Sequence, residues 1–245
     1  MRGWWREFAG LVLPVACGGC GRRRTALCTD CGQALYGVGP RRVRPCPEPP
    51  GLPVVHAAAP YEDAVRAVLL AHKERGALGL AGALGTALAG AIRGSVAASG
   101  AQPVQLSQPL LLVPVPSARR AVRARGHDAG RRIALAASGE LRRAGVPARV
   151  LAVLRQRRAV VDQSGLGARE RLANLAGALE VAAGGRRLLE GGRVVLVDDL
   201  MTTGASLVEA SRALRATDEQ LFRGFGQLSA AVVAAPSPAF EINRN

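Results

Sequence analysis

The sequence predicts an α/β fold in which a mainly parallel sheet is flanked by helices, with a small cysteine-rich module at the N-terminus. Short apolar segments alternate with longer helical patterns along most of the 245 residues, as they do where helices join parallel strands. Hydrophobic residues make up 49% of the chain but aromatic residues only 3%, which predicts an aliphatic core suited to such a sheet. All five cysteines lie within the first 50 residues, apart from this alternating region.

A proline-rich stretch, PCPEPPGLP at residues 45–53, marks a linker between two regions of different composition. We expect residues 1–50 to form the cysteine module with its linker. Residues 51–245 are long enough to bury a core of their own and are expected to form the α/β domain.

Within the second region, the apolar periodicity predicts strands and helices in alternation. Strands are expected at residues 54–59, 110–116, 149–154, 194–199 and 230–235. Helices are expected at residues 62–75, 78–96, from about 117 to 143 and from about 205 to 215. A polar, arginine-rich loop reaching residue 169 and then a short helix should follow the third strand.

The formal net charge is +15, from 33 basic and 18 acidic residues. An excess of this size favours a polyanionic partner such as phosphate groups or nucleic acid. Lys73 is the only lysine, so a coding bias towards arginine explains the charge equally well. Aromatic residues that stack on bases are scarce, which disfavours sequence-specific recognition of nucleic acid.

No apolar run approaches the roughly 18–20 uninterrupted residues that cross a bilayer, so we expect no membrane insertion. Residues 1–17 imitate an export signal that ends at Cys17, but their apolar part is short, contains Pro14 and follows Glu7. We therefore expect a cytoplasmic protein.

The segment RVVLVDDLMTTGASL, residues 193–207, joins an apolar strand to two carboxylates and a loop of small residues that opens a helix. Ligands of open α/β sheets bind at the carboxyl ends of strands, and a helix N-terminus offers free N–H groups to a phosphate. Asp198 and Asp199 are placed to accept hydrogen bonds from ribose hydroxyls. The residues expected to wrap the phosphate are Thr202, Thr203, Gly204, Ala205 and Ser206.

The alternative is an ordinary strand–turn–helix in which Asp199 and Thr202 cap the helix. Two adjacent carboxylates and two adjacent threonines exceed what a cap requires, so we favour the phosphate loop. It is not a P-loop, because no Gly-Lys-Ser/Thr follows.

This segment resembles the motif by which type I phosphoribosyltransferases bind phosphoribosyl pyrophosphate (PRPP). The resemblance implies the type I phosphoribosyltransferase fold for the second domain. It assigns Asp198 and Asp199 to the ribose 2′- and 3′-hydroxyls and residues 202–206 to the 5′-phosphate. It also implies that Mg²⁺ bridges the ribose and the pyrophosphate.

Cys17-Gly-Gly-Cys20 and Cys28-Thr-Asp-Cys31 are two CxxC pairs separated by seven residues. This spacing lets four thiolates converge on one Zn²⁺. A disulfide framework needs an oxidising compartment, and a redox CxxC is not expected to occur twice away from a thioredoxin-like context. We therefore expect a structural, zinc-ribbon-like site, with Cys46 left over as a free thiol.

A four-cysteine module fused to a PRPP-like motif resembles the ComF family, named for its part in bacterial competence for DNA uptake. Three further segments agree: HKERG at 72–76, VPVP at 113–116 followed by Arg125-Gly126, and a later arginine-rich loop. The residues that match this loop are Arg155, Arg157, Gln163, Arg171 and Asn174.

The candidate catalytic residues are Asp198, Asp199, Lys73 and Arg171. An ammonium at Lys73 suits pyrophosphate oxygens, although its retention can equally be chance. The loop that includes Arg171 can close over PRPP and stabilise the leaving pyrophosphate, or can be a solvated charged loop.

The chain departs from the family pattern in three places. Val160 stands where a threonine is common, and residues 127–129 are His-Asp-Ala where Phe-Asn-Gln is usual. Residues 217–229 are longer and more polar than the usual turn before the last strand. The histidines at 56, 72 and 127 have no ligand spacing or nucleophile partner, so no catalytic role is expected for them.

Three hypotheses follow for the function. The first is a PRPP-binding phosphoribosyltransferase that releases pyrophosphate through an oxocarbenium-like state. The second is a non-catalytic accessory protein that handles single-stranded DNA with a competence helicase or DNA-processing proteins. The third is a zinc-ribbon nucleic-acid binder whose charge supplies affinity for the backbone.

Overall fold

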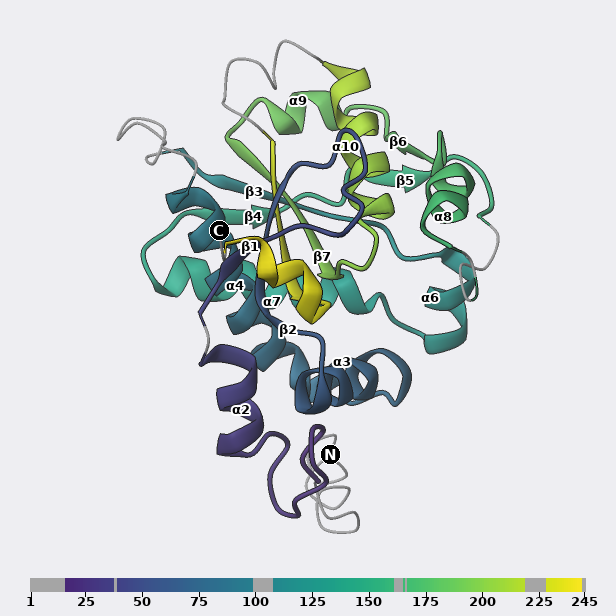
Figure 1. The fold of residues 1–245 in the computed structure, drawn as a ribbon. Coiled ribbons are helices and arrows are strands. Elements are labelled where there is room, and N and C mark those ends of the chain that lie inside the picture. Colours follow the sequence, from purple (N-terminus) through teal and green to yellow (C-terminus); the bar gives the residue numbers. More distant parts are fainter. Residues whose placement is uncertain are drawn as a thin grey trace.

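The computed structural model describes residues 16–37, 39–98, 108–160, 165, 167–218 and 228–243. A six-stranded sheet, in the order β1-β2-β8-β7-β3-β4, forms its centre (Figure 1). The strands are β1 (Arg41–Val43), β2 (Val54–Pro60), β3 (Leu110–Pro114), β4 (Ala148–Val150), β7 (Arg193–Leu200) and β8 (Ser229–Ala235). The short edge strand β1 pairs antiparallel with β2, and the other neighbours pair in parallel. The prediction of an α/β fold with a mostly parallel sheet is confirmed.

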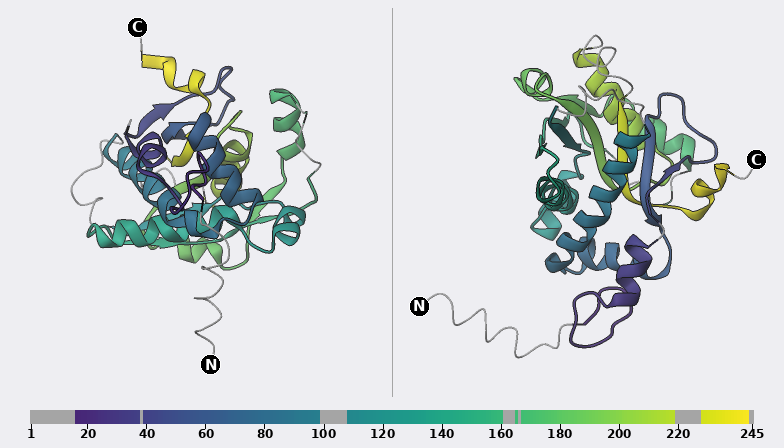
Figure 2. Two further views of the ribbon diagram at one scale, coloured as in Figure 1. Left: turned by 90° about the horizontal axis from the view of Figure 1, so that it is seen from below. Right: turned by 90° about the vertical axis from the view of Figure 1, so that its left-hand side faces the viewer.

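Helices cover both faces of this sheet. On one face lie α3 (Asp63–Glu74), α4 (Ala81–Ala97) and α7 (Ala129–Arg143), and on the other lies α10 (Ala205–Thr217) (Figures 1 and 2). The other helices of the described residues are α2 (Thr29–Tyr36), α6 (Arg119–Arg125), α8 (Ala168–Leu175) and α9 (Gly185–Leu189), with 3₁₀ turns η1 (Leu78–Leu80) and η2 (Ser237–Asn243).

The alternation of side chains along β7 explains this sandwich. Val195 and Val197 belong to the core on the α4–α7 side, whereas Val194 and Leu196 belong to the core on the α10 side. Successive side chains of a strand point to opposite faces, so a strand that is apolar throughout must be covered on both. β7 is therefore central, and its carboxyl end is held rigidly.

Two expected elements are each divided in the structure. The helix expected from 117 to 143 breaks into α6 and α7 at Gly126, whose φ of 72° ends α6 in the left-handed region. The strand expected at 149–154 becomes β4 and a separate strand β5 (Leu154–Gln156), which pairs with β6 (Leu179–Val181) in a second, two-stranded sheet. Most of the 217–229 segment lies outside the described residues.

One segment of the described residues has the length and composition of a membrane span, although Arg93 interrupts its apolar run. Leu78–Ala97 is 20 residues long with a mean hydropathy of 1.3. More than half of this window, 56%, is buried inside the fold, where α4 packs against β2, β8 and α7. Burial of this kind is what a core helix of a soluble protein shows, and the cytoplasmic location stays a prediction.

The cysteine module packs against α3. A side-chain carbon added at Gly19 would lie 2.6 Å from Cys31 Sγ and 3.4 Å from Val68, and one added at Gly18 would meet Leu80 at 2.6 Å. The small residues of the first CxxC pair therefore allow the module to approach the helix closely. Figure 2 shows the module at the end of the molecule next to α3.

Candidate phosphate site and metal centre

The candidate site lies where the order of strands reverses. The chain passes from β3 to β4 on one side of the sheet and from β7 to β8 on the other, although β3 and β7 are neighbours. The connections that leave β3 and β7 therefore diverge at the carboxyl ends of these strands, the usual place for a ligand in an open α/β sheet. Asp198 and Asp199 stand at this end of β7.

An ion pair joins this strand to α3. The ammonium of Lys73 lies 2.8 Å from Oδ2 and 3.1 Å from Oδ1 of Asp199, across 126 residues of sequence. The side chain of Asp199 is only 8% exposed, whereas that of Lys73 is 29% exposed. The adjacent Asp198 accepts a hydrogen bond from the backbone N–H of Asp199 at 2.8 Å. Two of the predicted site elements, the acidic pair and the lysine, are thus brought together.

The ionisable groups of this cluster shift one another's pKa values. Burial of its carboxyl group and the charge of the adjacent Asp199 raise the pKa of Asp198 to about 8. Burial alone would lower the pKa of Lys73, but the attraction of Asp199 outweighs it and the pKa is raised. At neutral pH the cluster therefore holds one ion pair and a largely protonated Asp198, which can both donate and accept hydrogen bonds.

The loop after the acidic pair is anchored at both ends. The buried Met201 donates its backbone N–H to the carbonyl of Ala234 at 3.0 Å. Gly204, at a φ of 77°, is the N-cap of α10, and an added side-chain carbon there would lie 2.8 Å from Leu52. Only glycine combines this left-handed backbone with so close a neighbour.

The N-terminus of α10 is free for a ligand. Gly204 provides no capping side chain, so the first N–H groups of the helix lack the partner that a serine or aspartate would offer. The capping alternative for Asp199 and Thr202 therefore does not describe this turn. A small hollow opens beside it, lined by Asp198, Leu200, Met201, Thr202, Thr203, Gly204, Ala205, Ser206 and Leu207.

A further basic residue, Arg125, lies beside this cluster and was given no individual role by the sequence analysis. Its side chain is 14% exposed, its Nε donates to the carbonyl of Ala121, and its Nη1 is buried without a hydrogen-bond partner in the described part of the chain. The largely exposed carboxylate of Glu74 lies 3.9 Å from this Nη1, which is too far for a hydrogen bond. Burial acts most strongly to lower the pKa of Lys73, and the positive charge of Arg125 acts in the same direction, as expected for two neighbouring cations. The Arg-Gly pair that ends α6 was its only signal in the sequence.

The arginine-rich loop is placed differently from the acidic pair. Arg171 lies on α8, and among the described residues no hydrogen bond or ion pair joins it to Asp198 or Asp199. Arg155 pairs with Glu180 at 2.9 Å and Arg158 donates to three backbone carbonyls, so both stabilise the local structure. The assignment of Arg171 to the site stays a prediction, and Gln163 lies outside the described residues.

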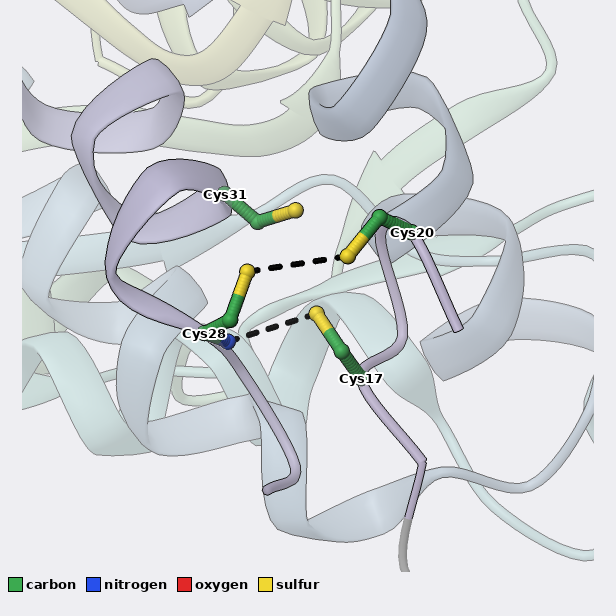
Figure 3. Close-up of side chains that lie close together, drawn as sticks. All are labelled: Cys17, Cys20, Cys28 and Cys31. Carbon is green, nitrogen blue, oxygen red and sulfur yellow. Dashed lines mark hydrogen bonds between the residues drawn. The ribbon is translucent and has the colours of Figure 1, made fainter. Parts of the chain in front are cut away.

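The four cysteines of the two CxxC pairs point towards one centre (Figure 3). Their sulfur atoms all lie within 4.8 Å of one another, and those of Cys20 and Cys28 are 3.6 Å apart. The second pair lies at the start of α2, where the backbone N–H of Cys28 donates to Sγ of Cys17 at 3.3 Å. All are free thiols, as is Cys46.

The environment of these thiols suits a cation. Burial acts to raise the pKa of Cys17, but hydrogen bonds from the backbone N–H groups of Cys20, Cys28 and Gly19 outweigh it and lower the pKa to about 6. Burial and the neighbouring sulfurs raise the pKa of Cys31 well above its usual value. The closed four-cysteine arrangement suits structural zinc, which would stabilise the deprotonated form of all four sulfurs.

Comparisons with known proteins add no family assignment, since no protein-family model and no curated protein matches the chain. The chemical geometry of the two sites therefore carries the functional conclusions.

We expect the purified, reduced protein to contain about one Zn²⁺ per chain, because four converging thiolates form a closed site. Cys28→Ser should lose the metal, while Cys46→Ser, which changes the exposed cysteine outside the cluster, should keep it. Elemental analysis with thiol titration measures both. Metal-free protein whose cysteines are paired as disulfides would show that the zinc assignment is wrong.

The raised pKa of Asp198 also predicts a pH dependence of stability. In the unfolded chain this carboxyl group loses its proton near its ordinary value of 3.8, so the folded state binds more protons up to about pH 8. Its contribution to the free energy of unfolding therefore falls as the pH rises from about 4 to about 8. Asp198→Asn removes this penalty and should make the ligand-free protein more stable at pH 8 by more than about 1 kcal/mol. Urea unfolding of both proteins at several pH values tests this, and parallel curves would contradict it.

Proposed function

We propose that this chain is a PRPP-binding protein of the ComF family with the type I phosphoribosyltransferase fold, and that it transfers a phosphoribosyl group with release of pyrophosphate. The observation that carries the proposal is the carboxyl end of β7. There, Asp198 and Asp199 stand directly before a helix N-terminus without a capping side chain, and Asp199 is fixed by Lys73.

Each part of PRPP has a complementary group in this arrangement. The backbone N–H groups and hydroxyls of residues 202–206 suit the 5′-phosphate, which gains from the dipole of α10. Asp198 and Asp199 suit the neighbouring ribose hydroxyls. The pyrophosphate would face Lys73 and Arg125, whose buried Nη1 still needs an acceptor.

The reaction would break the bond between the anomeric carbon and the pyrophosphate oxygen, while an acceptor nucleophile forms its bond to the same carbon. The electron pair leaves with pyrophosphate, and positive charge develops on the ribose ring. Lys73 and Arg125 would stabilise the leaving group, while the anchored loop and acidic pair keep the ribose in place. These roles require preformed geometry, which the buried strand β7 and the ion pair to Asp199 provide.

Mg²⁺ fits this site as an ion carried by the ligand. Within the described part of the chain, the four cysteines are the one group of three or more potential ligands that could hold a metal ion. Mg²⁺ commonly keeps most of its contacts with phosphate oxygens and water, and when bound it would neutralise charge on the pyrophosphate.

A second candidate function is supported by α6. This helix buries none of its residues, and Arg119, Arg120 and Arg123 on it are exposed next to Arg125. Such a surface suits a polyanion such as single-stranded DNA, as a non-catalytic accessory protein would need. Binding of PRPP without pyrophosphate release from any acceptor, ammonia and purine bases included, would favour this second function.

Replacing both carboxylates, Asp198→Asn with Asp199→Asn, should keep the fold and weaken PRPP binding. The amides preserve shape but remove the anionic acceptor at Asp199 and the ionisable group at Asp198, and a charge-assisted hydrogen bond is worth roughly 1.5–3 kcal/mol, or about ten- to a hundred-fold in affinity. Inorganic phosphate should be affected less, because it depends on the backbone of residues 202–206. Calorimetry with PRPP and Mg²⁺ measures both, and undiminished PRPP binding by the double variant would overturn the proposal.

Arg125→Gln should weaken PRPP binding by about tenfold or more, because the buried guanidinium loses its role as a partner of the pyrophosphate. Arg123→Gln is the matched control, since it removes an exposed arginine from the same helix and should change the affinity by less than about threefold. Ribose 5-phosphate, which has no pyrophosphate, should bind to both variants equally. Equal losses of PRPP affinity in the two variants would show that the assignment of Arg125 to the PRPP site is wrong.

A further inference from the structure

Two histidines meet beside the candidate site. His72, on α3, is fully buried, and its imidazole contacts that of His127 edge-on, with 5.9 Å between the ring centroids. His72 directly precedes Lys73, and His127 follows Arg125 by two residues in the turn between α6 and α7. The pair therefore joins the two segments that carry the cations of the proposed pyrophosphate site.

Each ring of the pair lies next to a backbone carbonyl. Nδ1 of His72 lies 3.3 Å from the carbonyl of Ala77, and Nδ1 of His127 lies 3.0 Å from the carbonyl of Arg125. A carbonyl oxygen only accepts, so these contacts favour the neutral tautomer with the hydrogen on Nδ1 and a lone pair on Nε2. Both Nε2 atoms are buried and have no hydrogen-bond partner among the described residues.

The surroundings of this pair oppose a full positive charge on it. Burial lowers the pKa of His72, and the charges of His127 and Arg132 act in the same direction, while the backbone of Ala77 and of Ala129 favours the protonated ring. Charged groups close to the pair in sequence include Lys73 and Glu74 on α3, Arg125 on α6, and Asp128 at the start of α7. With Arg132 these are three cations and two carboxylates, so protonation adds charge to a region that is already positive.

We propose that His72 and His127 are positioning residues whose neutral pair holds the α6–α7 turn against α3, so that Arg125 and Lys73 face the same anion. Protonation places positive charge between the two segments, and the turn loosens. The expected loss of PRPP affinity rests on the proposed function, whereas the expected loosening of the α6–α7 turn does not.

The proposal requires an aromatic ring at position 127 that contacts His72, and a nitrogen in that ring that can take up a proton. His127→Phe keeps a ring of similar shape but removes the nitrogen atoms, and His127 is only partly buried, so the fold should tolerate it. His56→Gln is the matched control, because His56 is a buried histidine on β2 whose pKa is also lowered by burial.

Two measurements test the proposal. Long-range ¹H–¹⁵N spectra at pH 7.5 should show both rings of the pair as neutral Nδ1–H tautomers. Between pH 7.5 and 5.5, PRPP affinity of the wild-type protein should fall by about fivefold or more beyond that of His127→Phe, while His56→Gln follows the wild type. The comparison between the proteins cancels the titration of the ligand itself.

Parallel pH profiles for the wild type and His127→Phe, or an Nε2–H tautomer at pH 7.5, would overturn the proposal. Hydrogen exchange of residues 119–130, corrected for intrinsic rates, reports the turn without any ligand. Acid-accelerated exchange in the wild type but not in His127→Phe supports the proposal even if none of the proteins binds PRPP. Absence of PRPP binding would contradict the proposed function but not the role of the histidine pair.

Discussion

The ion pair between Lys73 and Asp199 is the constraint on which the candidate site depends. Two carboxylates in succession at the end of a buried strand repel each other, and burying them without a cation would be costly. Lys73 compensates one of them, and Asp198 then keeps its proton to about pH 8. The same contact ties α3 to β7, so the position of the helix and the charge of the site are determined together.

The position of α3 also links the cysteine module to the candidate site. The module packs on α3 through its two glycines, next to Val68 and Leu80, and α3 carries both Lys73 and His72. A metal that rigidifies the module would therefore support the helix that holds the cation of the site. The fusion of a zinc-ribbon-like unit to an α/β domain then has a structural reason that does not require the metal to take part in chemistry.

Local patterns in the sequence were sufficient to predict much of the fold. The strand, acidic pair and helix of β7 and α10 lie within one continuous segment, and the two CxxC pairs lie within fifteen residues, Cys17 to Cys31. The break at Gly126 was missed because the apolar periodicity continues on both sides of it. The split of the expected 149–154 strand depends on which neighbour each half pairs with, which no local pattern contains.

The features that could not be predicted depend on contacts between residues far apart in the sequence. The insertion of β8 between β2 and β7 brings together segments that are far apart in sequence, and the contact of Lys73 with Asp199 spans 126 residues. The family resemblance pointed to Lys73 but not to its partner. The meeting of His72 and His127 had no signal, because a single histidine on a helix and another in a turn are unremarkable until the fold places their rings 5.9 Å apart.

The most direct test of the central claim is calorimetry of the wild-type protein with PRPP, ribose 5-phosphate and pyrophosphate, each with Mg²⁺. If the acidic pair, the loop at residues 202–206 and the Lys73–Arg125 cations form one site, PRPP should bind at least about tenfold more tightly than either fragment, and each fragment should compete with it. Binding of PRPP no tighter than either fragment, or fragments that do not compete, would contradict a single PRPP site at the end of β7.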